Sequence, residues 1–285
     1  MTPHAKGLLI ATLGVLSISP DTLLIRMADM DYGPTLFWRS LFTSIGLILL
    51  IVCTKRSHTL SSVTNLGRSG MLVIVLFSLS NLAFLLAIHL TTVANTLVII
   101  STAPVFAALM GRIFLGEPIS KRTWIATSIV MAAIFYIFSQ DIQGPTSWGN
   151  LGALASAIAL SATFVVTRRQ KNIDMTPAMA GSALLSLLIA IPFVTSFSIS
   201  GEALLVFVAL GVFLTVAFTL LFIAPRYVPA TEVSLLMPLE TILGTYLVWL
   251  VIGEEPSSRS IIGGIIIISV LTLNSLYGIR ENRGS

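Results

Sequence analysis

Long runs of apolar residues, separated by short polar links, occupy most of the chain. Ten runs can be marked, at residues 7–27, 34–54, 69–88, 94–114, 123–140, 148–167, 177–197, 203–224, 230–252 and 260–278. Each is close to the roughly 20 helical residues that cross about 30 Å of hydrocarbon. The runs lack the polar–apolar alternation of a membrane β-barrel, and only a helix satisfies its own backbone in lipid. The pattern therefore predicts an all-α integral membrane protein with ten transmembrane helices.

The composition agrees with lipid as the main solvent. Apolar residues make up 55% of the 285 residues and charged residues only 10%, whereas soluble domains carry about 25% charged residues. The single cysteine, Cys53, excludes an intramolecular disulfide and any cysteine-based metal cluster. Because the links between runs are short, we expect one compact bundle whose function lies within the membrane.

Basic residues give the bundle an orientation. With the N-terminus in the cytoplasm, thirteen of the sixteen Lys and Arg residues fall on the cytoplasmic side, at positions 6, 55, 56, 68, 112, 121, 122, 168, 169, 171, 226, 280 and 283. Only Arg26 and Arg259 fall on the other side, and Arg39 lies inside the second run. The positive-inside rule then predicts a cell inner membrane protein with both termini cytoplasmic. The bases are spread over many loops without interleaved aromatic residues, which favours contact with lipid headgroups and argues against nucleic acid.

The chain contains an internal repeat. At an offset of 137, six of fourteen ungapped positions are identical: Gly116/Gly253, Glu117/Glu254, Ser120/Ser257, Arg122/Arg259, Ile125/Ile262 and Ile129/Ile266. Five runs separate the two copies, and because five is odd the copies face opposite sides of the membrane. We expect a 5+5 inverted-topology repeat, with residues 1–140 and 141–285 as its halves. Such halves have two near-equivalent arrangements, as alternating access requires; the alternative is a non-transporting scaffold or sensor with the same fold.

The repeated Gly-Glu turn has two interpretations. The glycine is suited to a left-handed helix cap, and Ser120 or Ser257 can cap the following helix through its hydroxyl group. In the other interpretation, Glu117 or Glu254 has a gating role.

Asp21 and Arg39 are predicted to form an ion pair between the first two spans. At 1.5 Å per residue, Asp21 lies about 9 Å below the outer boundary and Arg39 about 7.5 Å below it. Ionisable groups at such depths need a partner or a wet cavity. The pair either pins two neighbouring helices together or takes part in binding a substrate or proton.

Glu240 is the main candidate for substrate binding or coupling, because it lies about 15 Å into the ninth run, at the bilayer midplane. It either faces a cavity, where it could bind a cationic or amine-bearing substrate or carry a proton, or it pairs with a neighbouring helix. Pro238 loosens the helix nearby. Pro104 lies at the same depth in the fourth run, and such a pair resembles the interrupted helices of transporter sites. Asn81, also at this level, is a candidate for helix contact or ligand contact.

Two further residues are gating candidates: Asn95 near the start of the fourth run, and Glu232 at the cytoplasmic mouth of the ninth, where an interfacial contact is the alternative. Motifs of zinc proteases, P-loop NTPases and serine hydrolases are absent. His4, His58 and His89 fall at span ends or in loops, where we expect solvated surface positions. We therefore expect no enzyme, cofactor or metal site. The expected partners are a small-molecule substrate, the lipid bilayer and a proton or exchanged solute.

Several short motifs, taken in order, resemble the drug/metabolite transporter superfamily and its EamA-like ten-helix branch over nearly the whole chain. They are Phe37-Trp38-Arg39, Ala94-Asn95, residues 101–109 (STAPVFAAL), Gly116-Glu117 with Arg122-Thr123-Trp124, residues 229–233 (PATEV), Leu239-Glu240-Thr241, Gly253-Glu254 and Gly263-Gly264. The resemblance implies secondary transport of small organic metabolites, commonly amino acids or their relatives. It also implies a central cavity lined mainly by spans three, four, eight and nine. Many members carry proline directly after the span-nine glutamate, where this chain has Thr241.

Overall fold

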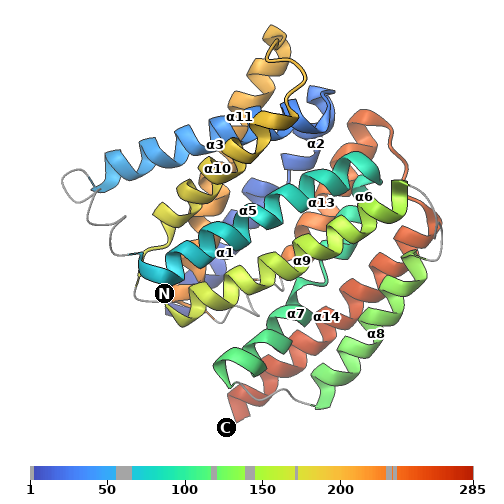
Figure 1. Cartoon of the computed structure of the whole chain (residues 1–285). Coiled ribbons are helices and arrows are strands. Elements are labelled where there is room, and N and C mark those ends of the chain that lie inside the picture. The colour runs from blue at the N-terminus through green and yellow to red at the C-terminus, as the bar shows by residue number, and fades with distance from the viewer. Residues whose placement is uncertain are drawn as a thin grey trace.

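The computed structural model describes residues 3–55, 66–116, 121–138, 145–170, 173–228, 233 and 236–284, and the regular elements of this part of the chain are all helices (Figure 1). In chain order they are α1 (Pro3–Ile18), α2 (Asp21–Ala28), α3 (Tyr32–Lys55), α5 (Gly67–Leu90), α6 (Val93–Ile100), α7 (Ala103–Met110), the π-helix η2 (Gly111–Leu115), α8 (Lys121–Phe138), α9 (Pro145–Arg169), α10 (Thr176–Ala190), the 3₁₀ helix η3 (Ile191–Phe193), α11 (Gly201–Ile223), the 3₁₀ helix η4 (Ala224–Arg226), α13 (Met237–Ile252) and α14 (Ser258–Gly284).

Ten segments of this bundle correspond, in order, to the ten predicted spans. Seven are long and apolar enough to cross a membrane: Lys6–Ala28, Tyr32–Thr54, Gly67–Leu90, Val93–Leu115, Thr146–Arg169, Thr176–Phe193 and Gly201–Arg226. Three shorter apolar helices complete the set: Trp124–Ala133, Leu239–Ile252 and Ser258–Val270. Large apolar side chains on the outside of the bundle are widely exposed, including Leu205 at 71% and Phe135 at 75%. Such a surface is typical of contact with lipid, and the predicted all-α, ten-helix membrane fold is confirmed.

Most of the helices pack against several others in the bundle. α5 packs along α9, α3 lies against α10 and α11, and α13 contacts α6 and α2. Helices α8 and α14 lie side by side at the edge of the bundle (Figure 1). Small residues allow close helix approach in membranes. At Gly211 of α11, an added Cβ would lie 2.6 Å from the Cβ of Phe42 on α3, so these two helices meet at a distance that only glycine permits.

Prolines interrupt three of the spans. Because proline lacks an N–H group and its ring clashes with the preceding turn, it ends a helix or begins a new one. Pro104 and Pro238 lie in the first turns of α7 and α13, as the pattern of midplane prolines predicts. Pro20 separates α1 from α2. This third interruption was not predicted, because the run 7–27 is apolar on both sides of the proline.

The two Gly-Glu turns lie at opposite ends of the bundle. Gly116 ends η2 with φ 71° and Gly253 ends α13 with φ 78°, so both adopt the left-handed cap that the sequence predicts. Glu254 accepts a hydrogen bond from the backbone N–H of Val93, where the fourth span begins, whereas Gly116 follows the last residue of that span. Ser257 caps α14 by accepting a bond from the N–H of Ser260. The predicted roles of Ser120 and Glu117 lie outside the described residues.

Candidate functional site

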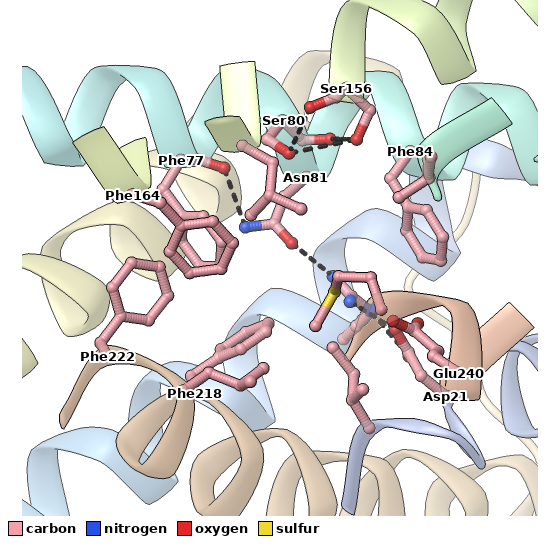
Figure 2. Close-up of a pocket in the computed structure, with 16 residues that line it drawn as sticks. Asp21, Phe77, Ser80, Asn81, Phe84, Ser156, Phe164, Phe218, Phe222 and Glu240 are labelled. Carbon is pink, nitrogen blue, oxygen red and sulfur yellow. Dashed lines mark hydrogen bonds and ion pairs between the residues drawn. The ribbon is translucent and has the colours of Figure 1, made fainter. Parts of the chain in front are cut away.

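A cavity lies in the middle of the bundle, with sixteen residues around it (Figure 2). The empty space between its walls, including the part that is open to the outside, is about 530 Å³. The lining residues come from spans one, two, three, four, six, eight and nine: Ile18, Asp21, Arg39, Phe77, Ser80, Asn81, Phe84, Ile100, Ser156, Leu160, Phe164, Phe218, Leu221, Phe222, Met237 and Glu240. Spans three, four, eight and nine all contribute, as the resemblance implies, but spans one, two and six also contribute.

Arg39 holds the polar end of this cavity together. Its Nε and Nη2 atoms donate to the two carboxylate oxygens of Asp21 at 3.2 and 2.7 Å, and its Nη1 donates to the Asn81 side-chain oxygen at 3.1 Å. Both members of the ion pair are almost fully buried. The predicted Asp21–Arg39 pair is therefore present, in the bidentate geometry that gives the strongest charge-assisted bonds. Asn81, whose amide nitrogen donates to the Phe77 carbonyl oxygen, joins this network.

Glu240 lies beside this network. Its side chain is 7% exposed and lines the cavity next to Asp21 (Figure 2). Asp21 and Arg39 line the same cavity. Within the described part of the chain, however, no hydrogen bond or ion pair reaches its carboxyl group. The interpretation that Glu240 pairs with an Asn or Thr across the bundle finds no such contact here.

Phenylalanines form the other end of the cavity. The Phe77 ring meets the rings of Phe218 and Phe222 edge-on, with centroids 4.9 and 5.0 Å apart, and Phe164 lies 5.4 Å from Phe222. In Figure 2 these four rings occupy the side away from Asp21 and Glu240. Between the two ends, the Ser80 and Ser156 hydroxyl groups bond to each other across α5 and α9. The cavity is thus amphipathic along its length.

A second polar cluster joins helix ends on the side of the bundle where α13 turns into α14. The Glu254 carboxylate accepts the N–H of Val93 at 2.6 Å and pairs with the Nε of Arg26 at 3.0 Å. Arg26 also donates through Nη2 to the Thr91 carbonyl oxygen at 3.1 Å. We call this Arg26–Glu254–Val93–Thr91 cluster the latch. It joins spans one, three, four and nine, so Glu254 links both halves of the chain.

The remaining sequence candidates lie near these two sites or beyond the described residues. Asn95 is buried beside the latch, where its side chain bonds to the hydroxyl groups of Thr91 and Ser260. Pro104 is buried at the interruption of span four and does not line the cavity. Pro238 is at the start of α13, two residues before Glu240. Glu232 lies outside the described residues.

One expectation was wrong. His89 was expected on solvated surface, but it is partly buried, with Nδ1 2.8 Å from the Leu85 carbonyl oxygen and Nε2 3.1 Å from that of Met30. The span end that carries it is covered by the link between α2 and α3, which sequence position alone does not reveal. Among the described residues, no three His, Cys, Asp or Glu side chains converge as metal ligands would.

A ten-helix apolar bundle that encloses a cavity with charged groups at membrane depth defines a polytopic membrane transporter. The comparison with known families agrees. The chain belongs to the EamA-like transporter family, whose model matches residues 5–139 and again residues 147–276.

Individual relatives extend the comparison. The chain is 26% identical to the uncharacterized transporter YdfC of Bacillus subtilis, over 91% of this chain and 87% of that protein. It is 22% identical to the pseudopaline exporter CntI of Pseudomonas aeruginosa, over 92% and 93%, and 25% identical to the riboflavin transporter of Rhizobium johnstonii, over 69% and 66%. A solved crystal structure shares the fold with a TM-score of 0.75 and 19% identity, over 97% of this chain and 99% of that one.

Proposed function

We propose that the protein is a secondary active transporter that moves a small organic metabolite, amino acid-like or drug-like, across the cell inner membrane by alternating access. The observation that supports this most is the buried Glu240 carboxyl group in a central cavity, where it has no hydrogen-bond or ion-pair partner among the described residues. A buried ionisable group without a partner is costly unless it serves a substrate or ion. A non-transporting scaffold would instead be expected to pair Glu240 fully, as Asn81 is paired.

The mechanism we propose lets the bundle change between two arrangements that are related by the inverted repeat of residues 1–140 and 141–285. Spans four and nine, which correspond in the two halves, both restart at a proline near the cavity. The latch closes one end of the bundle, so substrate would enter from the other. Opening the latch while the opposite end closes would complete one cycle, with a proton or exchanged solute as the driving force.

The positions of the basic residues support an orientation for this cycle. Lys6, Arg68, Arg112, Arg168 and Arg226 all lie near helix ends at the side where the chain begins and ends. By the positive-inside rule this side is cytoplasmic. The latch would then face the outside, and the arrangement described here would be open toward the cytoplasm.

A transport assay tests the proposal directly. Proteoliposomes loaded with a cell metabolite extract are incubated with and without a proton gradient, and the solutes that leave or stay are identified by mass spectrometry. We expect a small set of solutes to move only when the protein is present. The matched variants are both Leu→Trp changes on α9: Leu160 lines the cavity, whereas Leu151 is 45% exposed on the outer surface.

Leu160→Trp should abolish movement of these solutes, because the indole ring fills the cavity, and Leu151→Trp should leave it unchanged. Equal amounts of folded protein are confirmed for both variants by size-exclusion chromatography. If no solute moves with the wild-type protein, or if both variants transport equally well, the proposal is wrong.

A further inference from the structure

Two acidic side chains and one basic side chain line the cavity: Asp21, Glu240 and Arg39. We propose, on the basis of the transport function above, that the substrate is an organic cation: a single amine or ammonium group carried on an aromatic or apolar body, in preference to zwitterions and anions. Three features carry this assignment: the Glu240 carboxyl group, which has no partner among the described residues, the ion-paired Arg39 beside it, and the phenylalanine end of the cavity.

The first feature is the charge count at the polar end. Asp21 and Arg39 neutralise each other through their bidentate pair. Glu240 is only 7% exposed and lines the same cavity. It has no hydrogen-bond or ion-pair partner among the described residues. With both carboxyl groups ionised, the site holds one uncompensated negative charge. In surroundings of low dielectric constant, a cation that contacts this carboxylate removes a large desolvation cost.

The second feature argues against anionic groups. Arg39 is the basic residue that lines this cavity. Asp21 already neutralises its charge, and its Nη1 atom already donates a hydrogen bond to Asn81. The ring of Phe84 covers the guanidinium group, 5.6 Å from its centre. A substrate carboxylate would have to compete with Asp21 for Arg39 while lying beside the negative charge of Glu240. Zwitterions and anions are therefore disfavoured relative to a simple cation.

The third feature defines the body of the substrate. The rings of Phe77, Phe164, Phe218 and Phe222 form the end of the cavity opposite Glu240 (Figure 2). Aromatic side chains offer large apolar contact areas and edge-to-face geometry to another ring. A substrate whose amine contacts Glu240 would therefore place an apolar or aromatic body against these rings. Because Phe222 and Phe164 lie within the last six residues of α11 and α9, the body would follow the head group in from the end opposite the latch.

A series of four small probes tests the assignment on the purified wild-type protein. Phenethylamine carries the expected cation and ring, and butylamine has the cation without the ring. Phenylalanine adds a carboxylate to the cation and ring, and phenylacetate keeps the ring but carries a carboxylate in place of the amine. Binding is measured at pH 7 by isothermal titration calorimetry in detergent. We expect phenethylamine to bind at least tenfold more tightly than butylamine or phenylalanine, and phenylacetate to show no measurable binding.

Three variants locate the binding. Glu240→Gln should weaken phenethylamine binding at least tenfold. Glu202→Gln makes the same chemical change at an exposed residue at the start of α11 and should leave binding unchanged. Phe222→Leu should lower the preference for phenethylamine over butylamine severalfold while butylamine affinity stays the same. The wild-type probe series needs no variant, so a folding defect in Glu240→Gln does not remove the test.

The assignment is overturned if phenylalanine or phenylacetate binds as tightly as phenethylamine, if phenethylamine does not bind, or if folded Glu240→Gln binds it like wild type. The metabolite assay separates this failure from that of the transporter proposal. Movement of zwitterionic or anionic solutes that Leu160→Trp blocks would reject the cation class and keep the transport function, whereas the absence of any movement would reject both.

Discussion

Arg39 stabilises the cavity wall through three N–H groups, and its loss should have a large cost. Arg39→Gln leaves the buried carboxylate of Asp21 without its cation. Breaking a buried ion pair on one side typically costs about 3–5 kcal/mol. We expect the free energy of unfolding of Arg39→Gln to fall by about this amount. The measurement is denaturant or thermal unfolding in detergent, followed by tryptophan fluorescence.

The double variant Asp21→Asn/Arg39→Gln is the control, because it removes both charges together. It should recover most of the lost stability, since two neutral amide groups can bond to each other. The result would be contradicted by a single variant as stable as wild type. If the double variant is stable but no longer transports, the pair also has a functional role beyond pinning α2 to α3.

Residue depth explains why this pair could be predicted from sequence while its neighbours could not. Counting 1.5 Å per residue places Asp21 and Arg39 at similar levels in adjacent spans. The same count puts Asn81 and Glu240 near the midplane, but it does not give the rotation of their helices. That Asn81 turns toward Arg39 and that Glu240 lies next to Asp21 depends on the packing of α5 and α13 against α2 and α3.

At the scale of elements, the latch depends on contacts between helix ends. Glu254 belongs to the turn after α13, yet it bonds to Val93 at the start of α6, 161 residues earlier. Its carboxylate accepts an N–H group at a helix N-terminus, where negative charge is favoured. Arg26 at the end of α2 adds the opposite charge. With the bond from Arg26 to the Thr91 carbonyl oxygen at the end of α5, the latch fixes four helix ends relative to one another.

We expect Glu254→Gln to loosen this closure. The variant keeps an oxygen for the Val93 N–H group but loses the ion pair with Arg26. Both side chains of the pair are partly exposed, at 29% and 21%, so the loss is on the order of 1 kcal/mol, or about a fivefold increase in the open population. The reporter is Ile18→Cys, a cavity position, in a Cys53→Ser background. Its rate of labelling by a membrane-impermeant maleimide is measured from the side of the latch.

Glu255→Gln is the matched control, because the neighbouring side chain is exposed, and it should label at the background rate. Labelling from the opposite side, in inverted vesicles, should not increase in either variant. Equal labelling rates for Glu254→Gln and Glu255→Gln would show that the latch does not hold this end closed.

The sequence predicts how some of the helices end, but it does not predict most of the contacts between helices. The left-handed caps at Gly116 and Gly253 follow from local conformation, because glycine adopts positive φ at little cost, and they were predicted. The pairing of Glu254 with Arg26 joins residues of different halves of the chain, so no local rule indicates it. In the sequence, only the repetition of Glu117 and Glu254 marks this residue, and that repetition is compatible with a structural turn as well as with a gating role.

Across the whole bundle, the latch, the polar end of the cavity and the phenylalanine end follow one another from one side of the membrane toward the other. The polar end of the cavity lies toward the latch, the phenylalanine end lies toward the opposite side, and the interrupted spans one, four and nine all reach the cavity. In the proposed cycle, a closed latch separates the ion-pair network from one side of the membrane. This arrangement agrees with an inverted repeat only if the two Gly-Glu turns lie on opposite faces of the membrane.

The opposite placement of the turns can be measured in intact cells. The span Val93–Leu115 has 23 residues, so at 1.5 Å per residue its ends are about 35 Å apart. Arg112 lies at one end of it, and Glu255 lies in the turn near the other; both are exposed. In the Cys53→Ser background, we expect an impermeant maleimide to label Glu255→Cys in intact cells and to label Arg112→Cys only after permeabilisation.

The wild-type protein is the control. Its exposed Cys53 lies at the same end as Arg112, so it should also be labelled only after permeabilisation. Labelling of both variants in intact cells would place both turns outside and contradict the inverted repeat, and the reverse pattern would invert the orientation while keeping the repeat.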